Sequence, residues 1–174
     1  ILRIELSAIC GTDVHAWIGN VPTKKPVIMG HEYVGRIADA GAGITKLKIG
    51  DVVAGSYSAT CGRCQYCAKG KPQLCERRLL FGISIDGAFA EYMKVPRAER
   101  VLAKVPVDMP IETAVLVPDM FLTALYAVRR AKVRSGSTVL VTGLGAIGLS
   151  AIIAAKLEGA SKIVGLDVRD RPLT

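Results

Sequence analysis

The sequence predicts a mainly β domain followed by the start of an α/β unit. Over roughly the first 110 residues, short apolar runs alternate with glycine-rich turns such as 41–43, a pattern typical of strands joined by loops. Four of the five cysteines are grouped in one loop-like stretch of that region. Near the end, a β-branched run at 137–141 leads into glycines and then into a helical run. That order indicates a strand, a tight turn and a helix.

Hydrophobic periodicity predicts the individual elements. Alternation of apolar and polar residues in 32–40 and 88–95 predicts two half-buried strands. The stretches 111–117 and 120–133 predict two short helices, with a hinge between domains at 118–121. The second helix is expected to present one apolar face, made of Phe121, Leu122, Leu125 and Val128.

The grouped cysteines have the spacing C-x2-C-x2-C-x7-C. They are Cys61, Cys64, Cys67 and Cys75. Four thiolates at about 2.3 Å suit tetrahedral Zn²⁺, and close cysteine pairs supply them from a tight loop. Two alternatives remain, which are disulfides and an iron–sulfur cluster, although the bacterial ferredoxin run has a closer fourth cysteine followed by proline. A closed four-thiolate zinc site would stabilise the loop and do no chemistry.

Cys10 and His31 form a second candidate metal pair. Cys10 lies in "AICGTDVH" and His31 in "GHE". A thiolate and an imidazole suit catalytic zinc, which takes three protein ligands and keeps an open position. Each residue also has an ordinary interpretation, because a lone cysteine is usually a small buried apolar residue and a lone histidine is usually a hydrogen-bonded one.

The motifs together resemble the zinc-dependent medium-chain alcohol dehydrogenase family, in the secondary-alcohol and formaldehyde dehydrogenase branch with an aspartate zinc ligand. They are "CGTDVH", "GHEYVGRI", "KIGDVVAG", the cysteine lobe, "DGAFAEYMKVP" and "VLVTGLGAIGL". The resemblance implies a GroES-like β-barrel catalytic domain at 1–119, with the zinc lobe at about 60–79. Residues 120–174 would form a linking helix and the first βαβ unit of a Rossmann dinucleotide-binding domain. Family members are much longer, so we expect a fragment whose βαβ unit cannot cover both faces of its sheet.

The resemblance assigns residues to the catalytic zinc. Cys10, His31 and Asp119 would be its ligands, and carboxylate oxygen binds zinc at about 2.0–2.2 Å. Asp13 would accept the second ring N–H of His31. Glu32 would lie behind the metal and assist ligand exchange. Asp119 has an alternative role as the N-cap of the helix that follows, since aspartate is a strong N-cap residue.

The resemblance also implies a proton relay through Thr12 and His15. The alcohol proton would pass to the threonine hydroxyl, then through the cofactor ribose to the imidazole and to water. Histidine suits the last step because its unperturbed pKa is about 6.5. The alternative for His15 is an ordinary surface histidine.

A glycine turn marks the cofactor end of the chain. Gly143, Gly145 and Gly148 form G-x-G-x-x-G between a predicted strand and helix, which is the context that makes this motif specific for dinucleotides. The glycines permit the tight turn, the approach of the pyrophosphate and close helix packing. Ala146 and Ile147 would open the helix, whose N-terminus favours phosphate.

Asp167 favours NAD over NADP. It closes the second predicted strand, near the position at which an acid binds the adenosine ribose hydroxyls. A 2′-phosphate would meet a like charge there, although Arg169 offers a partner for that phosphate. The other interpretation of Asp167 is a turn residue after a strand.

Composition limits the other functional classes. The chain has 174 residues, a formal net charge of +8 and 51% hydrophobic residues. Its basic residues are scattered with little aromatic interleaving, so we expect no nucleic-acid partner. We expect no apolar run to reach the roughly 18 residues needed to span a membrane, and therefore no membrane partner. We expect two zinc ions per chain, NAD, a small alcohol or carbonyl substrate, a homo-oligomer (dimer or tetramer) and a cytoplasmic location. The substrate classes left open are secondary alcohols, polyols, threonine and formaldehyde adducts.

Two rival functions remain at this point. One is a non-catalytic truncated chain with a structural zinc lobe. The other is a zinc module that binds nucleic acid, in which the glycine turn and "GHE" would have no role.

Overall fold

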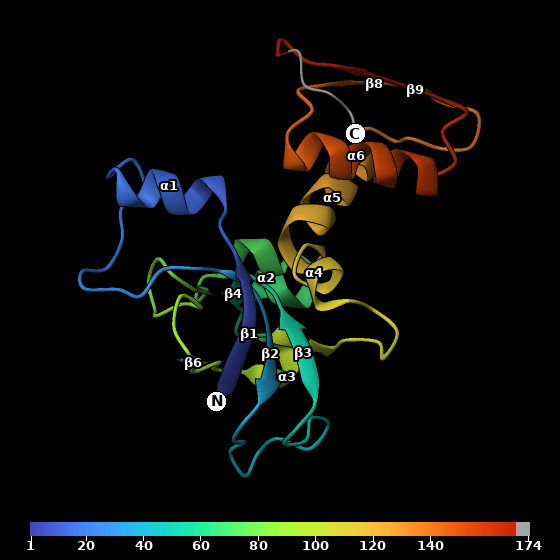
Figure 1. Cartoon of the computed structure of the whole chain (residues 1–174). Helices are drawn as coiled ribbons and strands as arrows, with labels where there is room; N and C mark the ends of the chain where they lie inside the picture. The colour runs from blue at the N-terminus through green and yellow to red at the C-terminus, as the bar shows by residue number, and fades with distance from the viewer. Residues whose placement is uncertain (170–174) are drawn as a thin grey trace. The chain divides into compact units, whose positions relative to one another are not determined.

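The computed structural model describes residues 1–169. It divides into two compact units, Ile1–Pro118 and Asp119–Thr174. Figure 1 shows the strands and the cysteine-bearing loop of the first unit and the helices and parallel strands of the second.

The first unit is built on a five-stranded antiparallel sheet in the order β6-β1-β2-β3-β7. Its strands are β1 (Leu2–Ala8), β2 (Glu32–Ile37), β3 (Val52–Gly55), β6 (Tyr92–Met93) and β7 (Leu102–Lys104). β1 and β2 pair along their whole length, with a register shift between Ile4 and Leu6. The C-terminal end of β1 therefore lies beside the start of β2.

Short helices and a small second sheet complete this unit. Helix α1 (Gly11–Trp17) follows β1 directly. The cysteine loop contains α2 (Gln65–Ala68) and the 3₁₀-helix η1 (Pro72–Leu74), between the paired strands β4 (Ser58–Ala59) and β5 (Leu79–Leu80). Helix α3 (Ala98–Val101) precedes β7, and α4 (Ile111–Ala114) follows it.

Strand β2 is buried on both faces, so the predicted alternation in 32–40 is wrong. Tyr33 belongs to the main core and packs edge to face on Phe81, with ring centroids 5.8 Å apart and an interplanar angle of 80°. Val34 points to the opposite face, where it packs with residues of β3 and of the α4 region, including Ala114. Strands covered on both faces lose the period-two pattern of a solvated sheet.

The predicted strand 88–95 shrinks to β6, Tyr92–Met93. The residues before it make a different set of backbone contacts. The N–H groups of Gly87, Ala88 and Phe89 donate to the carbonyls of Ile28, Gly30 and Met29. That pairing lies outside the strands of the sheet and holds the segment against the loop that precedes His31.

The two predicted short helices are joined into one helical run, Ile111–Arg130. A π-helix, η2 (Val117–Phe121), connects α4 to α5 (Leu122–Arg130). Pro118 explains the wide turn, because proline has no N–H for an α-helical bond to the carbonyl four residues earlier.

This run of 20 residues is long and apolar enough to cross a membrane by length and composition alone. The expectation that no apolar run reaches that length is therefore wrong. One such helix is weak evidence of a membrane partner, because core helices of other proteins pass the same test.

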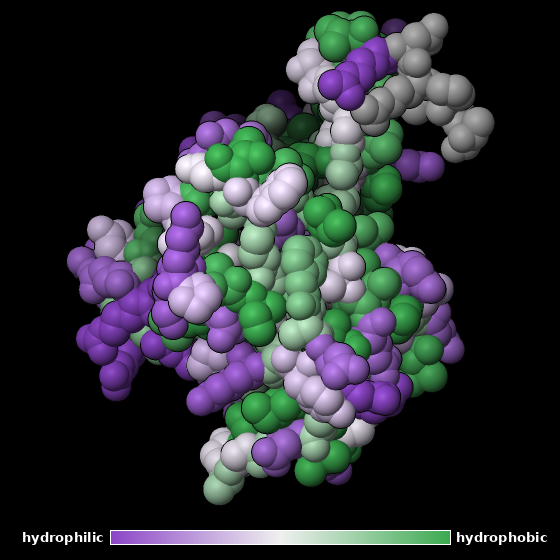
Figure 2. Space-filling model, turned by 60° about the vertical axis from the view of Figure 1, so that its left-hand side comes forward, coloured by the Kyte–Doolittle hydropathy of each residue, from purple (hydrophilic) through white to green (hydrophobic). Residues whose placement is uncertain are grey.

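The second unit contains the parallel strands β8 (Thr138–Thr142) and β9 (Lys162–Leu166), joined through α6 (Ala146–Leu157). Val128 of α5 packs against Ala154 and Ala155 of α6. Leu122 is 49% exposed, so its predicted place on the apolar face is wrong. Leu140, Val164 and Leu166 on the strands are also exposed. Figure 2 shows apolar side chains reaching the surface at several separate places among polar ones.

Candidate metal centre, zinc lobe and dinucleotide turn

Two distant segments bring the first metal pair together. Cys10 follows β1 and His31 precedes β2, and the pairing of Ala8 with Glu32 places these two strand ends side by side. Potential ligand atoms of Cys10, His31, Glu32 and Asp119 all lie within 4.8 Å of one another. The strand register thus brings Cys10 beside His31 and Glu32.

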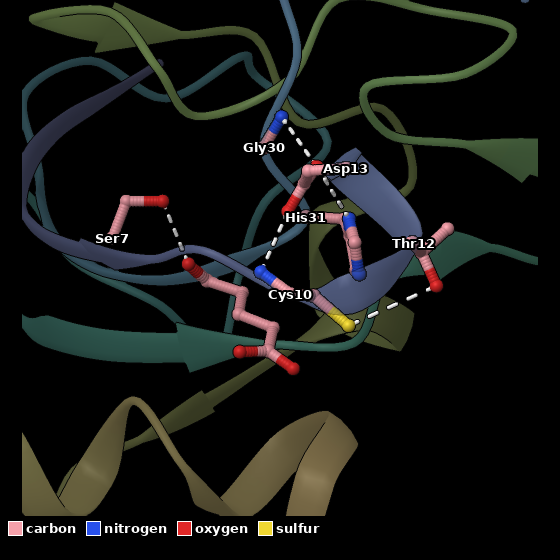
Figure 3. Close-up of polar contacts among 7 residues, drawn as sticks. Ser7, Cys10, Thr12, Asp13, Gly30 and His31 are labelled. Carbon is pink, nitrogen blue, oxygen red and sulfur yellow. Dashed lines mark hydrogen bonds and ion pairs between the residues drawn. The ribbon is translucent and has the colours of Figure 1, made fainter. Parts of the chain in front are cut away.

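Asp13 holds both halves of this group. Its Oδ2 accepts the Cys10 N–H at 2.9 Å, and its Oδ1 accepts the Gly30 N–H at 3.3 Å and lies 3.1 Å from His31 Nδ1. Asp13 and His31 are only 3% and 5% exposed. Figure 3 shows the ring of His31 between Asp13 and the Cys10 sulfur. A carboxylate on Nδ1 places the proton there, so Nε2 is the nitrogen that would bind a metal.

Glu32 is buried, with 2% of its surface exposed. It is the first residue of β2, and its carbonyl accepts the Ser7 hydroxyl of β1 at 2.8 Å. This hydrogen bond fixes the backbone from which the carboxylate reaches the donor group. A buried carboxylate needs hydrogen bonds, a cation or a proton to offset its desolvation.

Asp119 lies inside the π-helix and does not cap α5. The N-cap of α5 is Phe121, whose backbone is helical (φ −68°, ψ −43°) and which makes no side-chain cap hydrogen bond. The helix is continuous through Asp119, so the alternative role as an N-cap is wrong. Asp119 is bonded directly to Pro118, where the first unit ends.

The donor set fits zinc. At zinc distances of about 2.0–2.3 Å, neighbouring ligand atoms of a tetrahedron lie about 3.3–3.8 Å apart. The donor atoms found here are within 4.8 Å of one another. Shifts of about 1–1.5 Å in the side chains would therefore bring them to the spacing of a zinc tetrahedron. One thiolate, one imidazole and carboxylate oxygen match the mixed ligands of catalytic zinc.

Thr12 and His15 lie on α1 next to this group, and both are exposed. The Thr12 hydroxyl is 3.7 Å from Cys10 Sγ, and His15 Nδ1 is 3.5 Å from Asn20 Nδ2. Residues three apart share a helix face. The structure thus places a hydroxyl at the metal group and an imidazole one helical turn away toward solvent.

The cysteine loop forms a second metal group. The sulfur atoms of Cys61, Cys64, Cys67 and Cys75 all lie within 4.8 Å of one another, and none of these four cysteines is in a disulfide. Tetrahedral zinc thiolates have sulfur atoms about 3.8 Å apart. The amides of Cys61 and Cys64 point at the sulfurs of Cys75 and Cys61, at 3.3 and 3.4 Å. Amide donors stabilise thiolates, so this loop is preorganised for a cation.

Sequence patterns gave no indication of what anchors this lobe. Arg97 Nη1 donates to the carbonyls of Ala59 and Arg77, at 3.0 and 2.9 Å. The two carbonyls lie on either side of the cysteine loop. Arg97 also has a positive φ of 57°, which costs energy for a non-glycine residue. An isolated arginine carries no motif, so only the fold reveals this contact.

The thiols of the metal-free lobe are expected to react in a fixed order. The Arg63 amide lowers the pKa of Cys61 to about 6, whereas burial raises the pKa of Cys67 to about 11. Above the lower value Cys61 is a thiolate, while Cys67 stays protonated until far higher pH. Iodoacetamide near neutral pH, followed by peptide mass spectrometry, should therefore label Cys61 first. Equal labelling of both residues would contradict this assignment.

The glycine turn has the geometry of a dinucleotide-binding loop. Gly143 has φ 84°, which only glycine adopts without strain. A Cβ on Gly148 would collide with the Gly143 carbonyl oxygen. Helix α6 begins at Ala146 after Gly145, so the amides of Ala146 and Ile147 belong to its first turn and lack partners within the helix.

Asp167 is attached to this turn. Its Oδ2 accepts the Leu144 N–H at 2.6 Å, and its Oδ1 accepts the Arg169 N–H at 2.9 Å. A carboxylate is thereby held beside the glycines, at the end of β9. The backbone of Arg169 is held to the same carboxylate.

Known proteins share both the fold and the sequence. The alcohol dehydrogenase GroES-like domain matches residues 1–107. The chain belongs to the zinc-dependent medium-chain alcohol dehydrogenase family. It is 37% identical over 172 residues to L-threonine 3-dehydrogenase of Sinorhizobium fredii, covering 97% of this chain and 49% of that protein. It is also 37% identical to sorbitol dehydrogenase of Bacillus subtilis, covering 97% of this chain and 48% of that one.

Solved structures give the same result. The structure of alcohol dehydrogenase TADH from Thermus sp. ATN1 superposes with a TM-score of 0.93 at 36% identity, covering 97% of this chain and 50% of that one. A zinc-binding dehydrogenase from Sinorhizobium meliloti bound to NADP is 33% identical, with a TM-score of 0.87, covering 94% and 47%. The chain spans about half the length of the curated relatives it matches. These likenesses confirm the predicted GroES-like and dinucleotide-binding fold.

The segment that precedes His31 has a structural support that the motifs alone did not reveal. A Cβ on Gly30, which precedes His31, would lie 2.5 Å from the nearest atom of the Phe89 ring, and one on Gly82 would lie 2.8 Å from the Gly30 nitrogen. Together with Gly87, these residues pack backbone against backbone behind the histidine. The glycines of "FGISIDGAF" were the available signal, since glycine marks close backbone approach.

Proposed function

We propose that the protein is a zinc-dependent oxidoreductase that transfers a hydride between a secondary alcohol and NAD. The observation that carries this proposal is the convergence of Cys10, His31, Glu32 and Asp119 within 4.8 Å. Asp13 supports it by binding both the Cys10 amide and the His31 ring. The chain's dinucleotide turn supplies a place for the hydride acceptor.

In this reaction each group of the site has a separate role. Bound zinc would polarise the alcohol oxygen as a Lewis acid, and the nicotinamide would take the hydride. Asp13 keeps the His31 proton on Nδ1 and so presents Nε2. The Thr12 hydroxyl beside Cys10 would accept a hydrogen bond from the alcohol hydroxyl. His15, on the same face of α1, would take up the released proton and pass it to solvent. The lobe binds the second, structural zinc.

The names of the relatives narrow the substrate class. L-threonine 3-dehydrogenase and L-galactonate-5-dehydrogenase are named for oxidation at an interior carbon, which is a secondary alcohol. We therefore place secondary alcohols and polyols before formaldehyde adducts. The proposal includes a cytoplasmic location, where the lobe cysteines would stay reduced.

A substrate screen tests the proposal. NADH formation from secondary alcohols, polyols and L-threonine would be followed by absorbance, on this chain and on any longer product of its gene. Turnover should disappear after dialysis against a chelator and return with Zn²⁺. Full zinc occupancy with neither turnover nor dinucleotide binding would instead favour the non-catalytic alternative.

NAD should be preferred to NADP, because the Asp167 carboxylate repels a 2′-phosphate. Asp167→Asn should reduce that preference about tenfold, which corresponds to a loss of roughly 1.4 kcal/mol of repulsion. Asparagine keeps an oxygen to accept the Leu144 N–H but loses the charge that repels a 2′-phosphate. The ratio of kcat/KM for the two cofactors is the measurement. An unchanged ratio in Asp167→Asn would remove Asp167 from cofactor selection.

A further inference from the structure

The helical run around Asp119 has a feature that the ligand assignment does not use. Thr123 lies four residues after Asp119, and its Oγ1 donates to Asp119 Oδ1 at 3.2 Å. Thr123 is the second residue of α5, and Asp119 lies inside the π-helix before it. Residues four apart lie on one face of a helix, so the register of α5 aims the hydroxyl at the carboxylate.

This contact replaces the usual bond of a helical threonine. A threonine hydroxyl inside a helix commonly bonds the backbone carbonyl three or four residues earlier. Here its acceptor is the side chain of Asp119. A helical threonine divides between two χ1 rotamers, and the bond to Asp119 favours the one that faces the carboxylate.

Asp119 lies inside the wide turn at Pro118. A π turn accommodates one extra residue and rotates what precedes it relative to a regular α-helix. Asp119 is within that turn, and its ligand atom joins those of Cys10, His31 and Glu32. A carboxylate can rotate about its last bond, so one oxygen held by a hydroxyl restricts how the group faces an ion.

We propose that Thr123 is a positioning residue for the metal ligand Asp119. Its hydroxyl fixes the plane of the carboxylate and lowers the cost of ordering it when zinc binds. The proposal rests on the proposed function, because it takes Asp119 to be a ligand. Asp13 holds the ring of His31 in its metal-binding orientation. Thr123 would hold the carboxylate of Asp119 in the same way.

Thr123→Val tests the proposal, because valine keeps the shape and removes the hydroxyl. Zinc affinity at the Cys10 site should fall about tenfold, the low end of the usual 10–100-fold effect, because Thr123 is exposed. Thr123→Ser should restore most of it, and zinc in the lobe should not change. Affinity would be measured by competition with a chromogenic chelator. Co²⁺ substitution adds a readout, since its visible spectrum reports ligand geometry.

Thr113→Val is the matched control, an exposed threonine on α4 of the same helical run, and should leave both sites unchanged. Thr123→Ala is a second hydroxyl-free variant if the valine form folds poorly. The proposal is overturned if Thr123→Val binds zinc like the unchanged chain, or if the serine and valine variants lose affinity equally. A chain that binds zinc only in its lobe would overturn the proposed function as well, which separates the two failures.

Discussion

Replacing Cys10 with serine is expected to lower the zinc content from about two ions per chain to about one. Cys10 supplies the one thiolate among the donors of the first group, whereas the lobe has four of its own. A hydroxyl is a far poorer zinc ligand than a thiolate, so the first site should empty while the lobe stays filled. Dehydrogenase turnover should fall to background because the metal that polarises the alcohol is lost.

Cys67→Ser is the crossed control for this experiment. It should also leave about one zinc per chain, but in the first site instead of the lobe. Structural zinc contributes folding free energy directly, so the melting temperature of this variant should fall by about 10 °C. Cys10→Ser should change the melting temperature much less. Metal analysis and calorimetry on both variants distinguish the sites, and a full zinc content in Cys10→Ser would remove Cys10 from the ligand set.

Local motifs were enough to predict the lobe and the dinucleotide turn. Cys61 to Cys75 lie within one loop, so their spacing alone brings four sulfurs together. The turn at Gly143 likewise depends on neighbouring residues. Where ligands are close in sequence, the pattern contains most of the geometry.

The candidate site at Cys10 could not be predicted from its local motifs alone. The proximity of Cys10 to His31 depends on the pairing of Ala8 with Glu32, a long-range register that local periodicity does not specify. Asp119 had two interpretations in sequence, ligand and N-cap. The π turn at Pro118 decided against the cap, because the helix passes through Asp119 instead of starting there.

Local periodicity also explains the two wrong predictions about burial. Alternation was expected in β2, but Tyr33 and Val34 are both fully buried, one on each face of the sheet. Periodicity reports one solvated face, and it fails where a helix such as α4 covers the other. Leu122 was expected on the same apolar face as Phe121, but successive residues of a helix lie about 100° apart around its axis. Phe121 packs in the core of the second unit, and Leu122 is turned away from it and exposed.

Gly87→Ala is expected to destabilise the first unit by about 3 kcal/mol. A Cβ at this position would collide with the Gly30 carbonyl oxygen and lie 2.8 Å from both the Gly82 nitrogen and the Met29 oxygen. All three are backbone atoms, so no side chain can rotate away. The strain must move the loop that ends at His31, and zinc affinity at the first site should fall together with stability.

Gly41→Ala is the control, because a Cβ there meets nothing within 4 Å. It should leave the urea midpoint and the zinc affinity nearly unchanged. Both measurements are needed, since loss of stability alone would show only a tight turn. Loss of affinity at the Cys10 site, with lobe zinc retained, would show that the backbone packing of Gly30, Gly82 and Gly87 supports the ligand His31. If Gly87→Ala matched the control in both, the glycine packing would have no role in the metal centre.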